Sequence, residues 1–216
     1  MRNFSSAAVA MPQCSAEPSS EIARFNYVAI FFHWIVAALI LTNILVAWQF
    51  PVVHGALRNT IFQLHKSIGI SILLLSVLRL MWRLLNPPPP FVSTMRAWEM
   101  SAAKLVERGF YFVMLAMPLT GWAIVSTSDL HIPTVLFGVA QWPDLPVLSA
   151  LPFEQKLAAY GVSVNAHHLL ARMIYALLVL HVLAALRHQF IKRDHVLARM
   201  ISFLAPRRTF PDLRRR

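Results

Sequence analysis

The feature that most constrains this chain is a set of four long apolar stretches. They cover about residues 27–50, 62–85, 105–126 and 163–190, and each is close to or above the roughly 20 residues that a helix needs to cross a bilayer. Because hydrocarbon offers no hydrogen-bond partner to a peptide group, each stretch has to satisfy its backbone internally as a helix. The sequence therefore predicts an all-α fold, a transmembrane up-down four-helix bundle.

Composition excludes a soluble alternative. Of the 216 residues, 57% are hydrophobic and 13% are charged, whereas soluble domains contain about 25% charged residues. A soluble protein so poor in charge would expose large apolar patches and aggregate. The single cysteine, Cys14, excludes an internal disulfide and any cysteine-based metal site or iron–sulfur cluster.

The net charge of +11 is distributed unevenly between the two sides of the predicted bundle. Basic residues gather before the first span, between the second and third spans, and after the fourth. The opposite side offers Arg58 in the first connection and Lys156 in the long third one. The positive-inside rule therefore predicts that both termini lie in the cytoplasm. The basic tail is expected to contact lipid headgroups and solvent, and no nucleic-acid partner is expected.

Local composition divides the chain into three parts. Residues 1–24 are small and polar and are predicted to form a disordered tail, not a cleaved signal peptide. Residues 25–200 form the four-span domain, and residues 201–216 form a basic cytoplasmic tail.

Prolines mark two positions within the domain, and a long connection joins the last two spans. The run Asn86–Pro90 ends the second span, because proline cannot donate a backbone hydrogen bond and clashes with the preceding turn. Pro118 should kink the third span. The connection over residues 127–162 is rich in Pro, Trp and Leu. It is predicted to form an interfacial lid with Trp142 at headgroup depth.

Four histidines fall within the apolar stretches and pair by depth. His33 and His181 lie toward the cytoplasmic end, and His65 and His167 lie about one turn from the outer end. The 14 residues from His167 to His181 turn an α-helix by about 1400°, within about 40° of whole turns, so these two share a face about 21 Å apart. His168 points about 140° away from His181. We therefore predict two pairs, each spanning two helices, that exclude His168.

Paired neutral imidazoles inside a membrane suit the iron of a haem. A single buried histidine is more often a satisfied polar residue than a ligand, but four at matched depths favour ligation. Zinc would need three or four convergent ligands, and neither thiolates nor carboxylates lie at these depths. Haem iron takes one ligand on each side of its plane, which leaves no open position when both are histidine. Without a Cys-x-x-Cys-His attachment motif, the predicted group is b-type haem.

Three further positions suggest contacts with such a group. Arg79 follows His65 by 14 residues and should lie on the same face at the inner level. It either snorkels to the membrane surface or pairs with a haem propionate, and both alternatives stay open. Gly69 and Gly121 each remove a side chain where a neighbouring helix or a flat ligand would pack.

Several motifs together resemble the bacterial cytochrome b561 family of small four-helix dihaem cytochromes. They are YVAIFFHW, HKSIGISILLLSVLRLMWRL, NPPPP, AMPLTGW, HHLLARMIYALLVLH and HQFIKRD, and they span about residues 24–200. The resemblance implies that the axial ligands of two haem b groups are His33, His65, His167 and His181. It also implies a bacterial inner-membrane protein that exchanges electrons with a quinone. In superoxide-oxidising members, superoxide gives an electron at the outer side and ubiquinone receives it.

The first functional hypothesis is an oxidoreductase of the superoxide:ubiquinone type. Its outer haem, held by His65 and His167, and its inner haem, held by His33 and His181, would form a relay to a ubiquinone docked in the membrane. Basic groups near the outer mouth would attract a small anion such as superoxide, with Arg58, Lys66 and Lys156 as candidates.

Two alternatives belong to other classes. One is a haem b membrane-anchor subunit that relays electrons for a docked redox partner protein, a dehydrogenase or a hydrogenase. The other is a haem-free transporter that uses the histidines as a proton relay. The expectation that no Asp or Glu lies within the membrane argues against the transporter.

Overall fold

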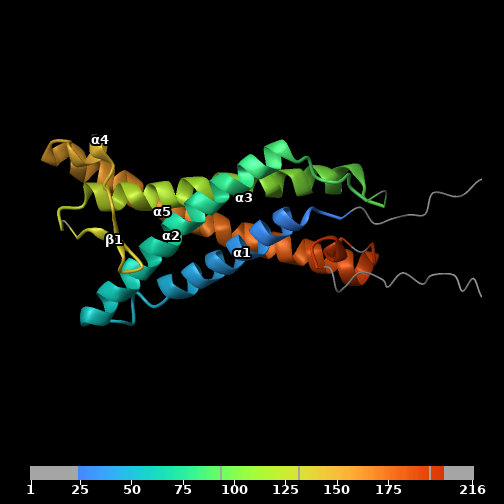
Figure 1. Ribbon diagram of the computed structural model, residues 1–216, viewed down its shortest axis with the longest axis horizontal. Coiled ribbons are helices and arrows are strands. Elements are labelled where there is room, and N and C mark those ends of the chain that lie inside the picture. The colour runs from blue at the N-terminus through green and yellow to red at the C-terminus, as the bar shows by residue number, and fades with distance from the viewer. Residues whose placement is uncertain (1–23, 93, 131, 195, 202–216) are drawn as a thin grey trace, which may run out of the picture.

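Four long helices form the body of the molecule. The computed structural model describes residues 24–92, 94–130, 132–194 and 196–201, so nearly all of the two predicted tails lies outside the described residues. Each long helix is long and apolar enough to cross a membrane. They are α1 (Tyr27–Ala47), α2 (Gly55–Leu85), α3 (Ala97–Thr127) and α5 (Phe153–Leu186) (Figure 1). The predicted all-α, transmembrane four-helix bundle is confirmed.

The two ends of the bundle differ in structure (Figure 1). At one end lie an antiparallel β-hairpin, β1 (Thr134–Leu136) with β2 (Ala140–Trp142), and the short helix α4 (Pro146–Ser149). We call this the hairpin end. The first and last described residues lie at the opposite end, which we call the terminal end. There α5 continues into a π-helical turn (Arg187–Lys192), and a 3-10 turn (Leu197–Arg199) follows.

Three helices begin earlier than their apolar stretches predict. Helix α2 begins at Gly55, α3 at Ala97 and α5 at Phe153, where the sequence predicted starts near 62, 105 and 163. The added turns carry polar and charged residues, which lower the hydropathy without breaking the helix. As a result, residues 153–162 of the predicted lid are helical, and only the part before them forms a connection.

Helix α1 ends at Ala47, three residues before the predicted end at 50. Pro51 explains this, because in a continuous helix its missing N–H would have to donate to the carbonyl oxygen of Ala47. The start of α1 is capped by Asn26, whose side-chain oxygen accepts a hydrogen bond from the N–H of Val28 at 2.9 Å.

The buried core is an apolar layer in the middle of the bundle, built by all four long helices. In α1, α2 and α5, its residues follow His33, His65 and His167 by three and by seven positions, so they share the face of the preceding histidine. The layer therefore lies between the two histidine levels. Its members are Val36, Ile40, Ile68, Ile72, Val113, Met114, Leu170 and Ile174.

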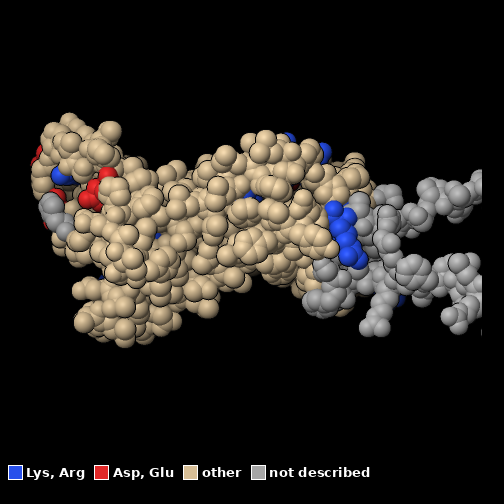
Figure 2. Space-filling view, in the orientation of Figure 1, with Lys and Arg blue, Asp and Glu red and all other residues tan. Residues whose placement is uncertain are grey.

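The outer surface fits a lipid environment. On the face shown in Figure 2, charged side chains gather toward the two ends, and a broad uncharged surface separates them.

One acidic residue departs from the expectation that no Asp or Glu lies within the membrane. Glu107 lies within the predicted third span, and its carboxylate pairs with the Arg83 guanidinium at 2.9 Å. The expectation that the spans contain no Asp or Glu was therefore wrong at this position, where the ion pair compensates the charge.

Candidate functional site

The structure places the four predicted histidines in two pairs, each joining α5 to another helix. At the terminal end, the ring centroids of His33 and His181 are 6.1 Å apart. At the hairpin end, those of His65 and His167 are 6.3 Å apart. His168 is exposed and belongs to neither pair, as the helical geometry predicted.

Both separations match the spacing of two imidazoles that share one metal ion. A metal–nitrogen bond is about 2 Å long, and a ring nitrogen lies about 1 Å from the centre of its ring. Two opposed imidazoles around one ion therefore have ring centroids about 6 Å apart. The separations fit the iron of a bis-histidine haem.

Backbone and side-chain groups of α3 fix the orientation of His167. The carbonyl oxygen of Met117 and Oγ1 of Thr120 each lie 3.1 Å from Nδ1 of His167. Because the Thr120 hydroxyl itself donates to the Met117 carbonyl at 2.7 Å, both oxygens can accept from a protonated Nδ1. The lone pair of Nε2 then remains available for a metal, which is the usual arrangement for a ligating histidine.

Gly121 lets the His167 ring approach α3 closely. A Cβ atom at position 121 would lie 3.3 Å from Cε1 of His167, tighter than an ordinary carbon contact. A Cβ at Gly69 would meet only Nδ2 of Asn43, at 3.9 Å. Of these two glycines, Gly121 therefore makes room for the His167 ring, and Gly69 packs loosely against α1.

The partner ring, His65, sits among aromatic side chains at the hairpin end. Phe50 meets it edge-on at 5.2 Å and stacks on Phe62 at 4.1 Å. Nδ1 of His65 and Oδ1 of Asn43 are buried with no hydrogen-bond partner among the described residues. If Nε2 of His65 binds a metal, Nδ1 carries the ring proton and needs an acceptor, and the backbone of Asn43, which interacts with the His65 ring, is placed to supply it.

At the terminal end, a cation adjoins the histidine pair. Nη2 of Arg79 lies 3.3 Å from Nδ1 of His33, and its guanidinium carbon lies 5.7 Å from the ring centroid of Tyr111. Arg79 is thus at the inner level where its spacing from His65 predicted it. His181 is exposed, and Phe110 meets its ring edge-on at 5.4 Å.

The Arg79 contact bears on how His33 would bind iron. Arginine only donates hydrogen bonds, so Nδ1 of His33 accepts here and Nε2 carries the ring proton. Ligation through Nε2 requires the proton on Nδ1, and the Arg79 contact then has to open. A released guanidinium at this depth favours an acidic partner, and a haem propionate is one. The residues present therefore fit two bis-histidine haems, with Arg79 adjusting at one of them.

The β-hairpin is tied to α2 beside the His65 level. Nε2 of Gln63 donates to the Pro133 carbonyl at 2.8 Å, and its Oε1 accepts from the N–H of Val135 at 3.1 Å. Oγ of Ser67 accepts from the N–H of Phe137 at 3.0 Å. The predicted lid thus contains a hairpin that is anchored by hydrogen bonds to a membrane helix.

The three basic candidates at the hairpin end are not equivalent. Nζ of Lys66 donates to the Pro133 carbonyl at 3.3 Å, so part of its hydrogen-bonding capacity holds the hairpin. Arg58 is exposed and lies over the Phe62 ring at 5.6 Å, and Lys156 is half-buried. Arg58 is therefore the most accessible of the three to an anion.

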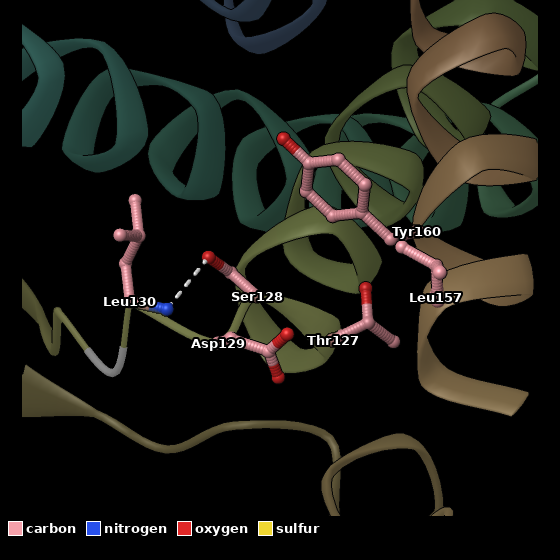
Figure 3. A pocket seen from close by; sticks show the side chains of 6 residues that line it. All are labelled: Thr127, Ser128, Asp129, Leu130, Leu157 and Tyr160. Carbon is pink, nitrogen blue, oxygen red and sulfur yellow. Dashed lines mark hydrogen bonds between the residues drawn. The ribbon is translucent and has the colours of Figure 1, made fainter. Parts of the chain in front are cut away.

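A pocket of about 200 Å³ lies where α3 ends and α5 begins (Figure 3). Asp129 is in its lining, and Oγ of Ser128 accepts from the N–H of Leu130 at 3.3 Å. Its lining includes none of the four paired histidines, and its carboxylate disfavours an anion. We assign it no part in the candidate site formed by the histidine pairs.

Sequence reasoning identified the histidines and Arg79 but missed the groups that orient them. Thr120 and the Met117 carbonyl belong to the AMPLTGW motif, in which the sequence predicted roles only for Pro118 and Gly121. The role of Met117 could not be seen in the sequence, because the carbonyl that accepts from His167 belongs to the backbone.

The chain matches known proteins along most of its length. Residues 24–203 match a family model described as prokaryotic cytochrome b561. The chain is 29% identical over 180 residues to "Cytochrome b561 homolog 2" of Escherichia coli (strain K12), covering 82% of this chain and 91% of the relative. It is 28% identical over 184 residues to "Probable superoxide oxidase CybB" of Yersinia pestis, covering 82% and 96%.

Proposed function

Because the chain belongs to the prokaryotic cytochrome b561 family, we propose that it is a dihaem oxidoreductase that passes electrons between a donor at the hairpin end and a quinone in the membrane. The family implies b-type haem. In this proposal, one haem is held by His65 and His167 and the other by His33 and His181. Arg79 would offer its guanidinium to an acidic group of the second.

The observation that carries this proposal is the spacing of the two histidine pairs. Ring centroids 6.1 and 6.3 Å apart suit one iron between each pair. The hydrogen bonds of His167 from Nδ1 leave Nε2 free to ligate. The alternative is that each histidine is a structural polar residue that binds no metal. Two separate pairs that share the α5 helix make this alternative a poor one.

When bound, haem supplies one-electron transfer between ferrous and ferric iron. The chain's own residues then do three things. His33, His65, His167 and His181 would hold the two haems, two imidazoles to each. Met117 and Thr120 hold one of the rings in its ligating tautomer. The apolar layer between the two levels excludes water, which keeps the electron path dry.

Superoxide is the donor that the comparisons favour, since a relative at 28% identity is named as a probable superoxide oxidase. A small anion would approach the hairpin end at the exposed Arg58. Acidic side chains at the same end, Asp129, Asp144 and Glu154, offset the charges of Lys66 and Lys156, so the attraction is local to Arg58. Ubiquinone is the proposed acceptor, because a quinone is soluble in the bilayer that surrounds the helices.

We place the hairpin end outside and the terminal end in the cytoplasm of a bacterial inner membrane. The support is the excess of Lys and Arg in the segments that flank the terminal end. A C-terminal alkaline phosphatase fusion should be inactive, and a green fluorescent protein fusion at the same place should fluoresce. The reverse pattern would overturn this orientation.

The proposed activity is tested with the purified protein alone. Superoxide generated enzymatically should reduce a ubiquinone analogue in the presence of the protein, and the His168→Ala variant should match the wild type. If dithionite reduces the haems but superoxide produces no quinol, the protein is instead a membrane anchor that needs a docked partner. An absence of haem from the purified protein would overturn both the oxidoreductase and the membrane-anchor hypotheses.

A further inference from the structure

A second titratable pair lies outside the four paired histidines, at the terminal end of α5. Nδ1 of His188 lies 2.6 Å from Oδ2 of Asp194. The side chains are 8% and 2% exposed, so both are buried. A buried carboxylate is expensive unless it is paired, and here its hydrogen-bonded partner is an imidazole, the side chain that most often transfers protons in enzymes.

The backbone between the two residues is shaped to bring them together. Residues Arg187–Lys192 form a π-helical turn in place of a continued α-helix, and π turns occur frequently at functional sites. Arg193 follows with φ 54°, in the left-handed region that non-glycine residues rarely adopt. These two departures reverse the chain and place Asp194 beside His188.

The neighbouring charged residues of the turn are paired elsewhere. Glu99 of α3 accepts from Nη1 of Arg187 at 2.7 Å and also from Nζ of Lys192. The π turn is thus anchored to α3 by Glu99, through residues on both sides of His188. The hydrogen bond between His188 and Asp194 therefore shares no residue with the ion pairs of Glu99.

The pair lies on the haem-ligand face of α5. His188 follows His181 by seven positions, which is close to two full turns, so it shares that face about 10 Å further toward the terminal end. The π turn changes this angle by a fraction of a turn. His188 therefore lies between the inner histidine pair and the solvent at the terminal end.

Two buried acceptors in and directly after the π turn have no hydrogen-bond partner among the described residues. They are Oδ1 of Asp194 and Oε1 of Gln189. Native proteins rarely leave buried acceptors unpaired, so such atoms indicate a bound water or a ligand that carries hydroxyl groups. For the pair itself, the relevant atom is Oδ1 of Asp194, which could accept from a water or from a hydroxyl group of a ligand.

We propose that His188 and Asp194 form the proton-donating site for quinone reduction at the terminal end. This inference rests on the proposed function. A quinone becomes a quinol by gaining two electrons and two protons. The electrons arrive one at a time from the donor at the hairpin end. For each of the two protons, Nε2 of His188 gives its proton to a carbonyl oxygen of the quinone. Asp194 stabilises the protonated imidazole through Nδ1, and solvent at the terminal end restores the proton.

The first test separates electron entry from quinone reduction. In His188→Gln and Asp194→Asn, the haem spectra and the rate of haem reduction by superoxide should equal those of the wild type. The rate at which added quinone reoxidises the haems should fall by about 100-fold or more for His188→Gln, the usual range for a lost general acid. His168→Gln is the matched control and should leave both rates unchanged.

Chemical rescue distinguishes a proton donor from a structural residue. Imidazole added to His188→Gly should restore a measurable part of the quinone-dependent rate, with a dependence on the concentration of its protonated form. Normal reoxidation in His188→Gln, or a slow variant with no rescue by imidazole, would overturn the inference.

A measurement on the wild type covers the case in which the variants fold poorly. In proteoliposomes with one orientation, quinone reduction should remove protons from the compartment that faces the terminal end, as read by a pH-sensitive dye. Proton uptake from the hairpin side would overturn the inference and leave the quinone activity intact. An absence of quinone reduction would instead refute the proposed function itself.

Discussion

The two histidine pairs differ in what holds their rings. At the hairpin end, His167 is fixed by a neutral carbonyl and a hydroxyl and packs against the backbone at Gly121. At the terminal end, His33 has the Arg79 guanidinium at 3.3 Å, and His181 is more exposed than its counterpart. The hairpin-end pair is therefore held by neutral groups in a fixed orientation. The terminal-end pair lies beside a cation, Arg79, whose contact with His33 has to open when His33 binds a metal.

This difference has a redox consequence. A positive charge stabilises the form of a nearby haem that carries the extra electron, and burial in low dielectric strengthens the effect. The terminal-end haem should therefore have the higher midpoint potential. Electrons would then run downhill from the hairpin end to the terminal end, in the direction that the proposed donor and acceptor require.

Removing ligands gives the largest expected effect. His167→Ala should abolish the haem at the hairpin end and His181→Ala the haem at the terminal end, because in the proposed assignment each variant removes one of the two histidines that hold a haem. The haem content per chain should fall to about half in each variant, as measured by the pyridine haemochrome assay. His168→Ala should keep the full content. Loss of haem in His168→Ala alone would show that the pairs are misassigned.

The rigidity of the hairpin-end site is tested at the two glycines. In Gly121→Ala the new methyl group would press on a ring that cannot retreat, so the variant should be destabilised by about 1–3 kcal/mol. Gly69→Ala, with its nearest neighbour at 3.9 Å, should be neutral or stabilised by about 0.5–1 kcal/mol, as expected for alanine in a helix. Thermal unfolding monitored by haem absorbance compares the two. Equal effects would indicate that His167 does not lie against Gly121 when haem is bound.

The charge at the terminal end is tested with Arg79→Gln. A unit charge about 10 Å away, at an effective dielectric of about 20, is worth about 1.7 kcal/mol, or about 70 mV for one electron. The higher of the two midpoint potentials should fall by about this amount in a spectroelectrochemical titration. Arg79→Lys should keep most of it. A shift of the lower potential instead would place Arg79 at the other haem.

The smallest effect is expected from Thr120→Val. This change removes one of two acceptors for Nδ1 of His167 and leaves the Met117 carbonyl in place. A net hydrogen bond is worth about 1 kcal/mol, so the potential of the hairpin-end haem should rise by less than about 40 mV. The terminal-end haem should not respond. A response of both haems would show that the apolar layer does not separate them.

Much of the fold was predictable because membrane-spanning helices can be recognised from the length and composition of their apolar stretches. The four helices, the pairing of the histidines and the exclusion of His168 follow from 20-residue apolar runs and from 100° per residue. The early starts of α2, α3 and α5 were not predictable in the same way, since their first turns are polar and hydropathy falls there.

The site was predictable only where single side chains carry the chemistry. The histidines and Arg79 stand out in an apolar sequence. The Met117 carbonyl is a backbone group that any residue could supply, and the β-hairpin depends on contacts of Gln63 and Ser67 with a segment about 70 positions away. The His188–Asp194 pair depends on a π turn and a left-handed residue, for which local sequence gives no clear signal.

The most direct measurement is the haem stoichiometry and spin state of the purified protein. Two b-type haems per chain, both low-spin in the electron paramagnetic resonance spectrum of the oxidised form, are the expected result, since the proposed assignment gives each iron two histidine ligands. One haem per chain, or a high-spin signal from an iron with an open position, would contradict the assignment of His33 with His181 and of His65 with His167.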